Sequence, residues 1–242
     1  MKRISLTLAT AGMFILGSAS ASAAVLQEEA AASKGFTQVL KEQFIAGGPA
    51  FMGIVLLSLI LGLAVAIERI IYLNMATTNT AKLKESVEQA LASGGVEEAK
   101  SVCRETAGPV ASIFYQGLER SGEGLEAAEK AVVSYGGVQM GQLEKNVSWL
   151  SLFIAIAPML GFMGTVIGMI QAFQKIAAVG NLSASLIAGD IQVALLTTVF
   201  GLIVAIILQI FYNYIIAKID SIVNDMEDSS IALIDMLAAS KK

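Results

Sequence analysis

Long apolar runs dominate the pattern of hydrophobic and polar positions along this chain. Residues 49–67 carry no charge, and neither do the longer runs 146–174 and 191–217. A helix rises about 1.5 Å per residue, so the two longer runs would each be about 40 Å long, more than the ~30 Å hydrocarbon core of a bilayer. The pattern predicts three transmembrane helices, the last two protruding from the bilayer or tilted in it. Their predicted bounds are 49–73, 146–178 and 191–217.

A shorter apolar stretch lies at the N-terminus. Lys2 and Arg3 precede it, and Ala21-Ser22-Ala23 follows it. A charged start, a short apolar stretch and an A-x-A site are typical of a signal peptide. We therefore expect residues 1–23 to be removed, with an uncleaved membrane anchor as the alternative. Residues 24–48 would then form a periplasmic N-terminal segment.

Basic residues set the expected orientation. Arg69, Lys82 and Lys145 flank the spans on one side, whereas residues 179–190, between the last two spans, contain no Lys or Arg. The positive-inside rule places basic flanks in the cytoplasm. The pattern predicts an N-out, C-in chain with a cytoplasmic domain at 74–145. It also predicts a periplasmic loop at 179–190 and a cytoplasmic C-terminal tail at 218–242.

The cytoplasmic region shows helical spacing of apolar residues and no strand-like alternation. Glycine and proline divide it into four expected helices, the last of which could continue directly into the membrane. Their bounds are Thr80–Leu91, Val96–Thr106, Pro109–Arg120 and Gly124–Lys145. The predicted fold class is an all-α integral membrane protein whose long helices extend into a small cytoplasmic helical bundle.

Composition limits the chemistry. Charged residues make up 15% of the chain, against about 25% in soluble domains. The net charge of −4 gives no reason to expect a nucleic-acid partner. Histidine is absent and Cys103 is the single cysteine, which we expect to be buried and structural because nothing nearby would activate it. We expect no enzyme activity, no metal site and no cofactor.

Small residues form a stripe on each of the last two spans. Gly161, Thr165, Gly168 and Ala172 share one helical face, and Ala194, Thr198, Gly201 and Ala205 repeat the spacing. Small residues let membrane helices approach closely. We therefore assign helix packing to Gly161, Gly164, Gly168 and Gly201. On one interpretation the threonines only pack, each bonding back to a carbonyl one turn earlier; on the other they line a polar path.

Further polar residues favour the second interpretation without deciding it. Asp190, Gln209 and Asn213 lie on the side of the last span that carries Thr198, and polar groups inside a bilayer usually face a cavity or a partner. The candidate lining is therefore Thr165, Thr198, Asp190, Gln209 and Asn213. Neither long span has a titratable side chain in its middle, so a proton-binding group there would belong to another chain.

Three motifs resemble the MotA/TolQ/ExbB proton channel family, and its ExbB-type members most closely. They are LEKNVSWLSLFIAIAPMLGFMGTVIGMIQAF, ALLTTVFGLIVAI followed by YN, and AIER at the end of the first span. The resemblance covers most of residues 50–214. It implies a homopentamer in the bacterial inner membrane whose last two spans surround a single-span ExbD-like partner.

The same resemblance implies a mechanism. The partner's membrane aspartate would accept protons close to Thr165 and Thr198, and proton flow would energise a TonB-like protein for outer-membrane transport. Some family members carry a glutamate where this chain has Val193, so either that carboxylate is dispensable or Asp190 takes part of its role. The alternatives are a TolQ-like stator for envelope maintenance and a passive membrane scaffold.

Overall fold

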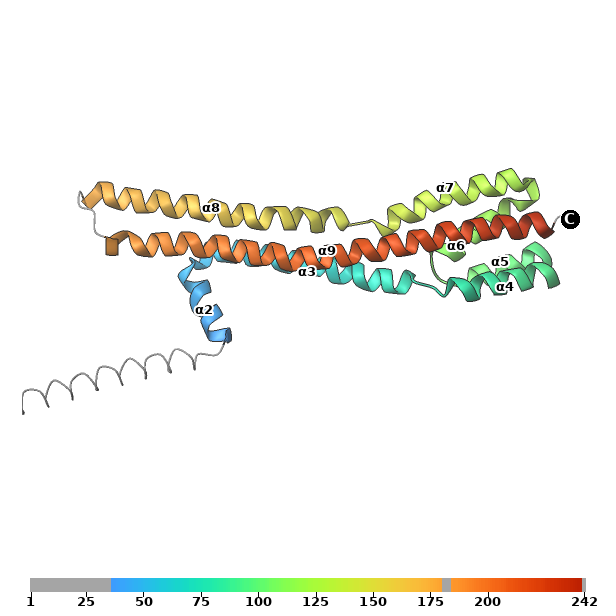
Figure 1. Cartoon of the computed structure of the whole chain (residues 1–242), viewed down its shortest axis with the longest axis horizontal. Helices are drawn as coiled ribbons and strands as arrows, with labels where there is room; N and C mark the ends of the chain where they lie inside the picture. The colour runs from blue at the N-terminus through green and yellow to red at the C-terminus, as the bar shows by residue number, and fades with distance from the viewer. Residues whose placement is uncertain (1–35, 180–183, 241–242) are drawn as a thin grey trace, which may run out of the picture.

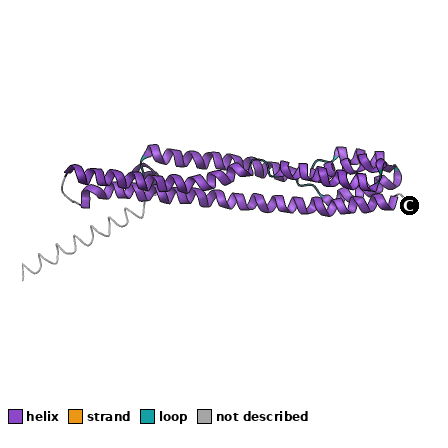
Figure 2. Cartoon of the chain, turned by 90° about the horizontal axis from the view of Figure 1, so that it is seen from above, coloured by secondary structure: helices purple, strands orange, loops and turns teal. Residues whose placement is uncertain are grey.

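The computed structural model describes residues 36–179 and 184–240 and is helical throughout them apart from short connections (Figures 1 and 2). The predicted all-α class is confirmed. The expected signal peptide and its cleavage site lie outside the described residues, as does part of the expected loop at 179–190.

Three long helices lie side by side: α3 (Pro49–Ala76), α8 (Val147–Val179) and α9 (Ala184–Ser240). Each contains a stretch long and apolar enough to cross a membrane, so the prediction of three spanning helices is confirmed. With 28, 33 and 57 residues, they are about 42, 50 and 85 Å long. All three exceed the ~30 Å hydrocarbon core. The N-out, C-in orientation stays a prediction.

α9 is much longer than a membrane span requires. Residues 218–240, assigned from the pattern to a tail, continue the same helix to the far end of the molecule (Figure 1). Ile219, Ile222, Met226, Leu233 and Leu237 on this extension are buried. The extension is therefore the core helix around which the bundle packs.

The bundle consists of α4 (Thr80–Ser93), α5 (Gly95–Glu105), α6 (Pro109–Arg120) and α7 (Leu125–Leu143), with a short 3₁₀ turn at Ser121–Glu123. The side chain of Asn79 accepts a hydrogen bond from the Lys82 backbone and caps α4. Gly108 has φ 125°, a conformation that favours glycine, and Pro109 opens α6 directly after it.

The expected run from α7 straight into α8 is not found. α7 ends at Leu143 and α8 begins at Val147, with Asn146 at φ 66° between them. Asparagine tolerates the left-handed conformation better than most residues. The chain thus breaks between the bundle and the membrane helix.

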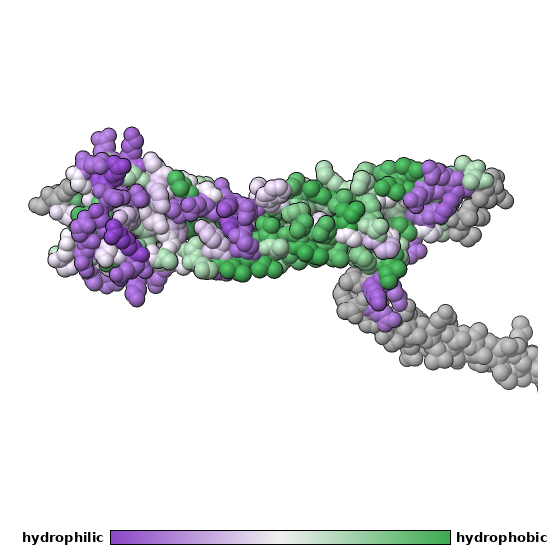
Figure 3. All heavy atoms as spheres, turned by 180° about the vertical axis from the view of Figure 1, so that it is seen from behind, coloured by the Kyte–Doolittle hydropathy of each residue, from purple (hydrophilic) through white to green (hydrophobic). Residues whose placement is uncertain are grey.

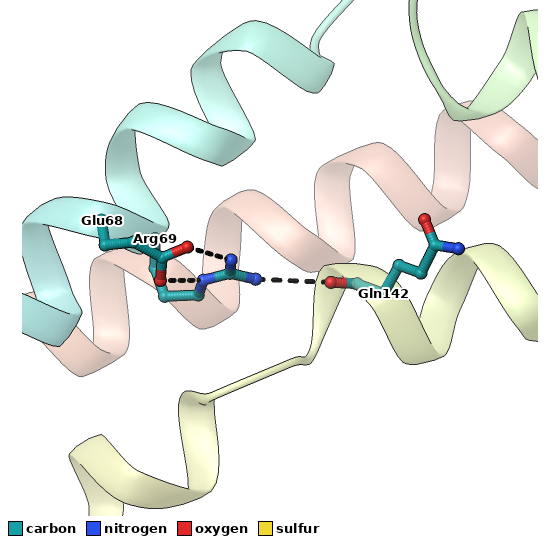
Figure 4. Close-up of polar contacts among 3 residues, drawn as sticks. All are labelled: Glu68, Arg69 and Gln142. Carbon is teal, nitrogen blue, oxygen red and sulfur yellow. Dashed lines mark hydrogen bonds and ion pairs between the residues drawn. The ribbon is translucent and has the colours of Figure 1, made fainter.

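Arg69, near the end of α3, is attached to this break (Figure 4). The residue is 3% exposed. Nε donates to Glu68 Oε2 at 2.7 Å, Nη2 pairs with Glu68 Oε1, and Nη1 donates to the Gln142 carbonyl at 3.3 Å. A cation near the C-terminal carbonyls of a helix is favoured by the helix dipole. Arg69 therefore joins the end of the first span to the end of α7.

A further helix, α2 (Phe36–Ala46), precedes the first span. The sequence pattern predicted only a periplasmic N-terminal segment at 24–48 and no helix within it. α2 projects away from the three long helices near the start of α3 (Figure 1). It is attached by an edge-to-face contact between Phe44 and Phe200, whose ring centroids are 6.4 Å apart.

The outer surface changes along the molecule. Figure 3 shows a hydrophobic band over the long helices, between the hydrophilic bundle and a smaller hydrophilic patch at the opposite end. Large apolar side chains remain exposed on all three spans, among them Ile60, Phe162, Ile170, Leu195 and Ile206. A single chain therefore leaves apolar faces for lipid, for a partner or for other copies.

Candidate functional site

The small-residue stripes lie where α8 and α9 touch. A methyl group added to Gly161 would lie 2.9 Å from the Thr197 carbonyl oxygen, and one added to Gly201 would lie 2.6 Å from that of Ala157. One added to Gly168 would lie 2.8 Å from Ala194 Cβ. These positions leave no room for a side chain, so the two helices meet backbone to backbone.

Gly164 lies on the same contact and faces a second helix. An added methyl group there would lie 2.7 Å from Thr197 Cβ and 2.9 Å from Phe51 Cε1 of α3. Gly164 therefore marks the place where all three long helices converge.

The two predicted threonines differ in their hydrogen bonds. Thr198 Oγ1 donates across the contact to the Gly161 carbonyl at 3.0 Å. Thr165 Oγ1 donates to the Phe162 carbonyl at 2.6 Å, within its own helix. The back-bonding expected from the packing interpretation is thus present at Thr165, whereas Thr198 bonds to the neighbouring helix. The choice between packing and lining stays a prediction for both.

Thr197 was missed from the sequence although it is the more buried of the two adjacent threonines. It is 1% exposed, and its hydroxyl lies 2.7 Å from the Ala194 carbonyl and 3.3 Å from that of Gly161. It borders a cavity of about 290 Å³ beside the start of α3 that Gln171 and Val193 also line. The helical period places both threonines near the contact, so spacing alone could not rank them.

Asp190 has a partner that the sequence did not reveal. Its Oδ1 lies 2.7 Å from Lys175 Nζ, and the side chains are 14% and 52% exposed, respectively. Its Oδ2 is buried without a hydrogen-bond partner among the described residues. Lys175 directly follows one charge-free run and Asp190 directly precedes the next. A hairpin brings the end of one run next to the start of the other. The positions of Lys175 and Asp190 at these two ends are therefore the signal that could have predicted the pair.

Gln209 and Asn213 lie apart from the threonines. Both are exposed, and Gln209 Nε2 donates to Asn213 Oδ1 at 3.0 Å. These polar residues of the last span thus form three separate groups along α9: Asp190 with Lys175, Thr197 and Thr198 with Gly161, and Gln209 with Asn213. The structure does not gather the predicted lining residues into one cluster within a single chain.

Other chemistry has little support in the described part of the chain. No group of three His, Cys, Asp or Glu side chains there could hold a metal ion. Cys103 is buried, as expected, and burial raises the pKa of its thiol to about 11. The thiol therefore stays protonated near neutral pH, in an environment suited to packing and not to nucleophilic attack.

The fold and this close contact define a multi-pass membrane protein with a tightly packed helical hairpin. Residues 105–228 match the model of the MotA/TolQ/ExbB proton channel family, and the chain belongs to that family. The family resemblance inferred from the motifs is confirmed. The family is one of proton channels, not of enzymes.

Named relatives agree with this assignment. The chain is 32% identical over 169 residues to a biopolymer transport protein ExbB homolog of Methanothermobacter thermautotrophicus, covering 69% of this chain and 60% of that protein. It is 35% identical over 94 residues to the biopolymer transport protein ExbB of Xanthomonas campestris pv. campestris, covering 36% and 37%. It is 27% identical over 193 residues to that of Neisseria meningitidis, covering 73% and 86%. The matches thus span less than two thirds of the first two relatives.

Proposed function

We propose that this chain is an ExbB-like stator subunit of a proton-driven complex in the bacterial inner membrane. With a single-span ExbD-like partner, it would use the proton motive force to energise a TonB-like protein and, through it, outer-membrane transport. The bundle would lie in the cytoplasm, since Arg69, Lys82 and Lys145 lie toward that end of the molecule.

The observation that carries the proposal is the α8–α9 contact, which has hydroxyl groups but no titratable side chain in its membrane-embedded middle. Thr198 and Thr165 each have a backbone carbonyl within 3.0 Å. A carbonyl cannot donate, so each hydroxyl uses its single proton there and keeps oxygen lone pairs free. The two oxygens can therefore accept a hydrogen bond from a protonated carboxyl group supplied by another chain.

This arrangement would favour the neutral form of the partner's carboxyl group. An ionised carboxylate only accepts hydrogen bonds, so it would find no donor in these two hydroxyls unless a bond to a carbonyl broke. Hydrogen bonding to the neutral form and an apolar surrounding both raise the pKa of a carboxyl group. The stator would thus hold the partner's acid protonated until movement exposes it to water.

Self-association is proposed from the apolar faces and the family. α8 and α9 each leave large apolar side chains exposed, among them Phe162, Met163, Leu202 and Ile206. In a ring these faces would contact neighbouring copies or the enclosed partner. The proposed number of copies, five, rests on the family resemblance.

Proton flux in liposomes tests the proposal. The chain alone should conduct few protons, and co-reconstitution with the single-span partner should raise the flux. Strong flux from the chain alone would contradict the missing-acid argument, and no flux with the partner would leave a passive scaffold. Co-purification with a TolR-like instead of an ExbD-like partner would make it a TolQ-like stator.

Two adjacent threonines offer a matched comparison for the lining role. Thr197→Val and Thr198→Val each remove one hydroxyl, and membrane hydrogen bonds average about 0.6 kcal/mol, so both variants should assemble with the partner. Only Thr198→Val, alone or with Thr165→Val, should lose most partner-dependent flux, because the Thr197 hydroxyl is buried inside the chain. Equal loss in both variants, or no loss in Thr198→Val, would return Thr198 to a packing role.

A further inference from the structure

An apolar groove of about 410 Å³ lies between α2, α3 and α9, within the size range of small-molecule sites. Its walls include Met52, Leu56 and Leu59 of α3 and Phe200 and Ile207 of α9. Lys41 of α2 is its single charged lining residue. The site is thus hydrophobic with a cation at its edge.

The groove covers about two thirds of the depth of one bilayer leaflet. It extends from Met52 to Leu59 on α3 and from Phe200 to Ile207 on α9. Seven residues correspond to about 10 Å along a helix, against about 15 Å for half of the ~30 Å hydrocarbon core. It lies at the end of α3 remote from the bundle, beside α2 (Figure 1). The walls could therefore enclose the greater part of a single acyl chain in the leaflet on that side.

Lys41 lies where a lipid headgroup would be. α2 precedes the first span and projects from the long helices near the start of α3. Figure 3 shows hydrophilic side chains of α2 beside the hydrophobic band. Lysine beside apolar surface typically keeps its ammonium at the water boundary. Lys41 is exposed and forms no ion pair with any described residue. Within the described residues, its charge is therefore available to an anion.

We propose that this groove binds an anionic phospholipid, with one acyl chain between α3 and α9 and the phosphate at Lys41. The contact of Phe44 with Phe200 holds α2, and hence Lys41, against the groove. The site lies outside the α8–α9 contact and does not depend on proton flow. Its success or failure can therefore be measured without the partner.

Native mass spectrometry of the delipidated full chain tests the proposal. The chain is titrated with phosphatidylglycerol or phosphatidylcholine of identical acyl chains, and the first-site dissociation constant is measured for each. Phosphatidylglycerol should bind more tightly. Lys41→Gln should reduce this preference about fivefold, because one lysine near an anionic surface contributes about 1 kcal/mol. Lys82→Gln, the same charge change on the bundle, should leave the preference unchanged.

A matched pair of leucines tests the groove itself. Leu56 lines it and Leu57 does not, and both are exposed, at 42% and 53%. Leu56→Trp should fill the groove and weaken binding of both lipids, whereas Leu57→Trp should not. Equal affinity for the two lipids, or a preference that survives Lys41→Gln, would overturn the headgroup contact. Unchanged lipid binding in Leu56→Trp with loss of the oligomer would show that another copy of the chain fills the groove.

Discussion

Replacing Gly161 with leucine tests whether backbone contact between α8 and α9 stabilises the hairpin. The first added carbon would lie 2.9 Å from the Thr197 carbonyl oxygen and 3.0 Å from Thr198 Cα. Ordinary contact begins near 3.4 Å. Both neighbours are backbone atoms, so no rotamer change can relieve the collision. The helices would have to separate.

The expected loss of stability follows from these contacts. Overpacking a close contact costs about 1–3 kcal/mol. Separation also breaks the Thr198–Gly161 hydrogen bond, about 0.6 kcal/mol for an average membrane hydrogen bond. Leucine has a better helix propensity than glycine, and Gly53→Leu in α3 controls for it, since an added carbon there meets nothing within 4 Å. The difference between the two variants should be about 2–4 kcal/mol.

Thermal unfolding in detergent, followed by far-UV circular dichroism, measures this difference. One kcal/mol shifts the midpoint by about 2–4 °C in chains of this size, so Gly161→Leu should unfold at least about 4 °C below Gly53→Leu. Size-exclusion chromatography should also show a smaller or heterogeneous oligomer for Gly161→Leu alone. Identical midpoints and elution profiles would refute the close contact.

Three further predictions concern the polar contacts and the thiol. Arg69→Leu should lower the free energy of unfolding by about 1.5–3 kcal/mol, because it removes charged hydrogen bonds at a buried site. The control Arg120→Leu breaks an exposed pair with Glu123 and should cost less than about 1 kcal/mol. Equal losses in thermal unfolding would contradict the anchoring role of Arg69. Lys175→Met should destabilise the hairpin by up to about 1 kcal/mol, and by less in high salt. The double variant Lys175→Asp, Asp190→Lys exchanges the two charges and should restore the unfolding midpoint. Failure of this exchange would exclude a simple ion pair. The Cys103 thiol should resist maleimide at neutral pH, because burial raises its pKa to about 11 and the thiolate is the reactive form. It should react once the chain is unfolded in detergent. Rapid labelling of the native chain would contradict its burial.

Local signals were sufficient to predict the three spans and the four bundle helices, but not α2 or the extension of α9. Charge-free runs locate α8 and α9 because a bilayer excludes charge over a fixed thickness. Gly108-Pro109 marks the start of α6, since proline can open a helix and glycine adopts the positive φ that precedes it. The absence of a mid-membrane acid is likewise a property of the sequence, and it is the reason why the proposed function calls for a partner that supplies one.

Contacts between distant residues were decided only by the tertiary structure. The hydroxyl of Thr198 bonds to Gly161, 37 residues away, and helical spacing cannot tell this from a bond within its own helix. The pairing of Lys175 with Asp190 depends on the hairpin register. Residues 218–240 continue α9 because the bundle buries one face of them, and the break at Asn146 accompanies the Arg69 contact with the end of α7. A sequence pattern reports the preference of each segment for water or lipid, whereas these features depend on which surfaces remain once the segments have packed.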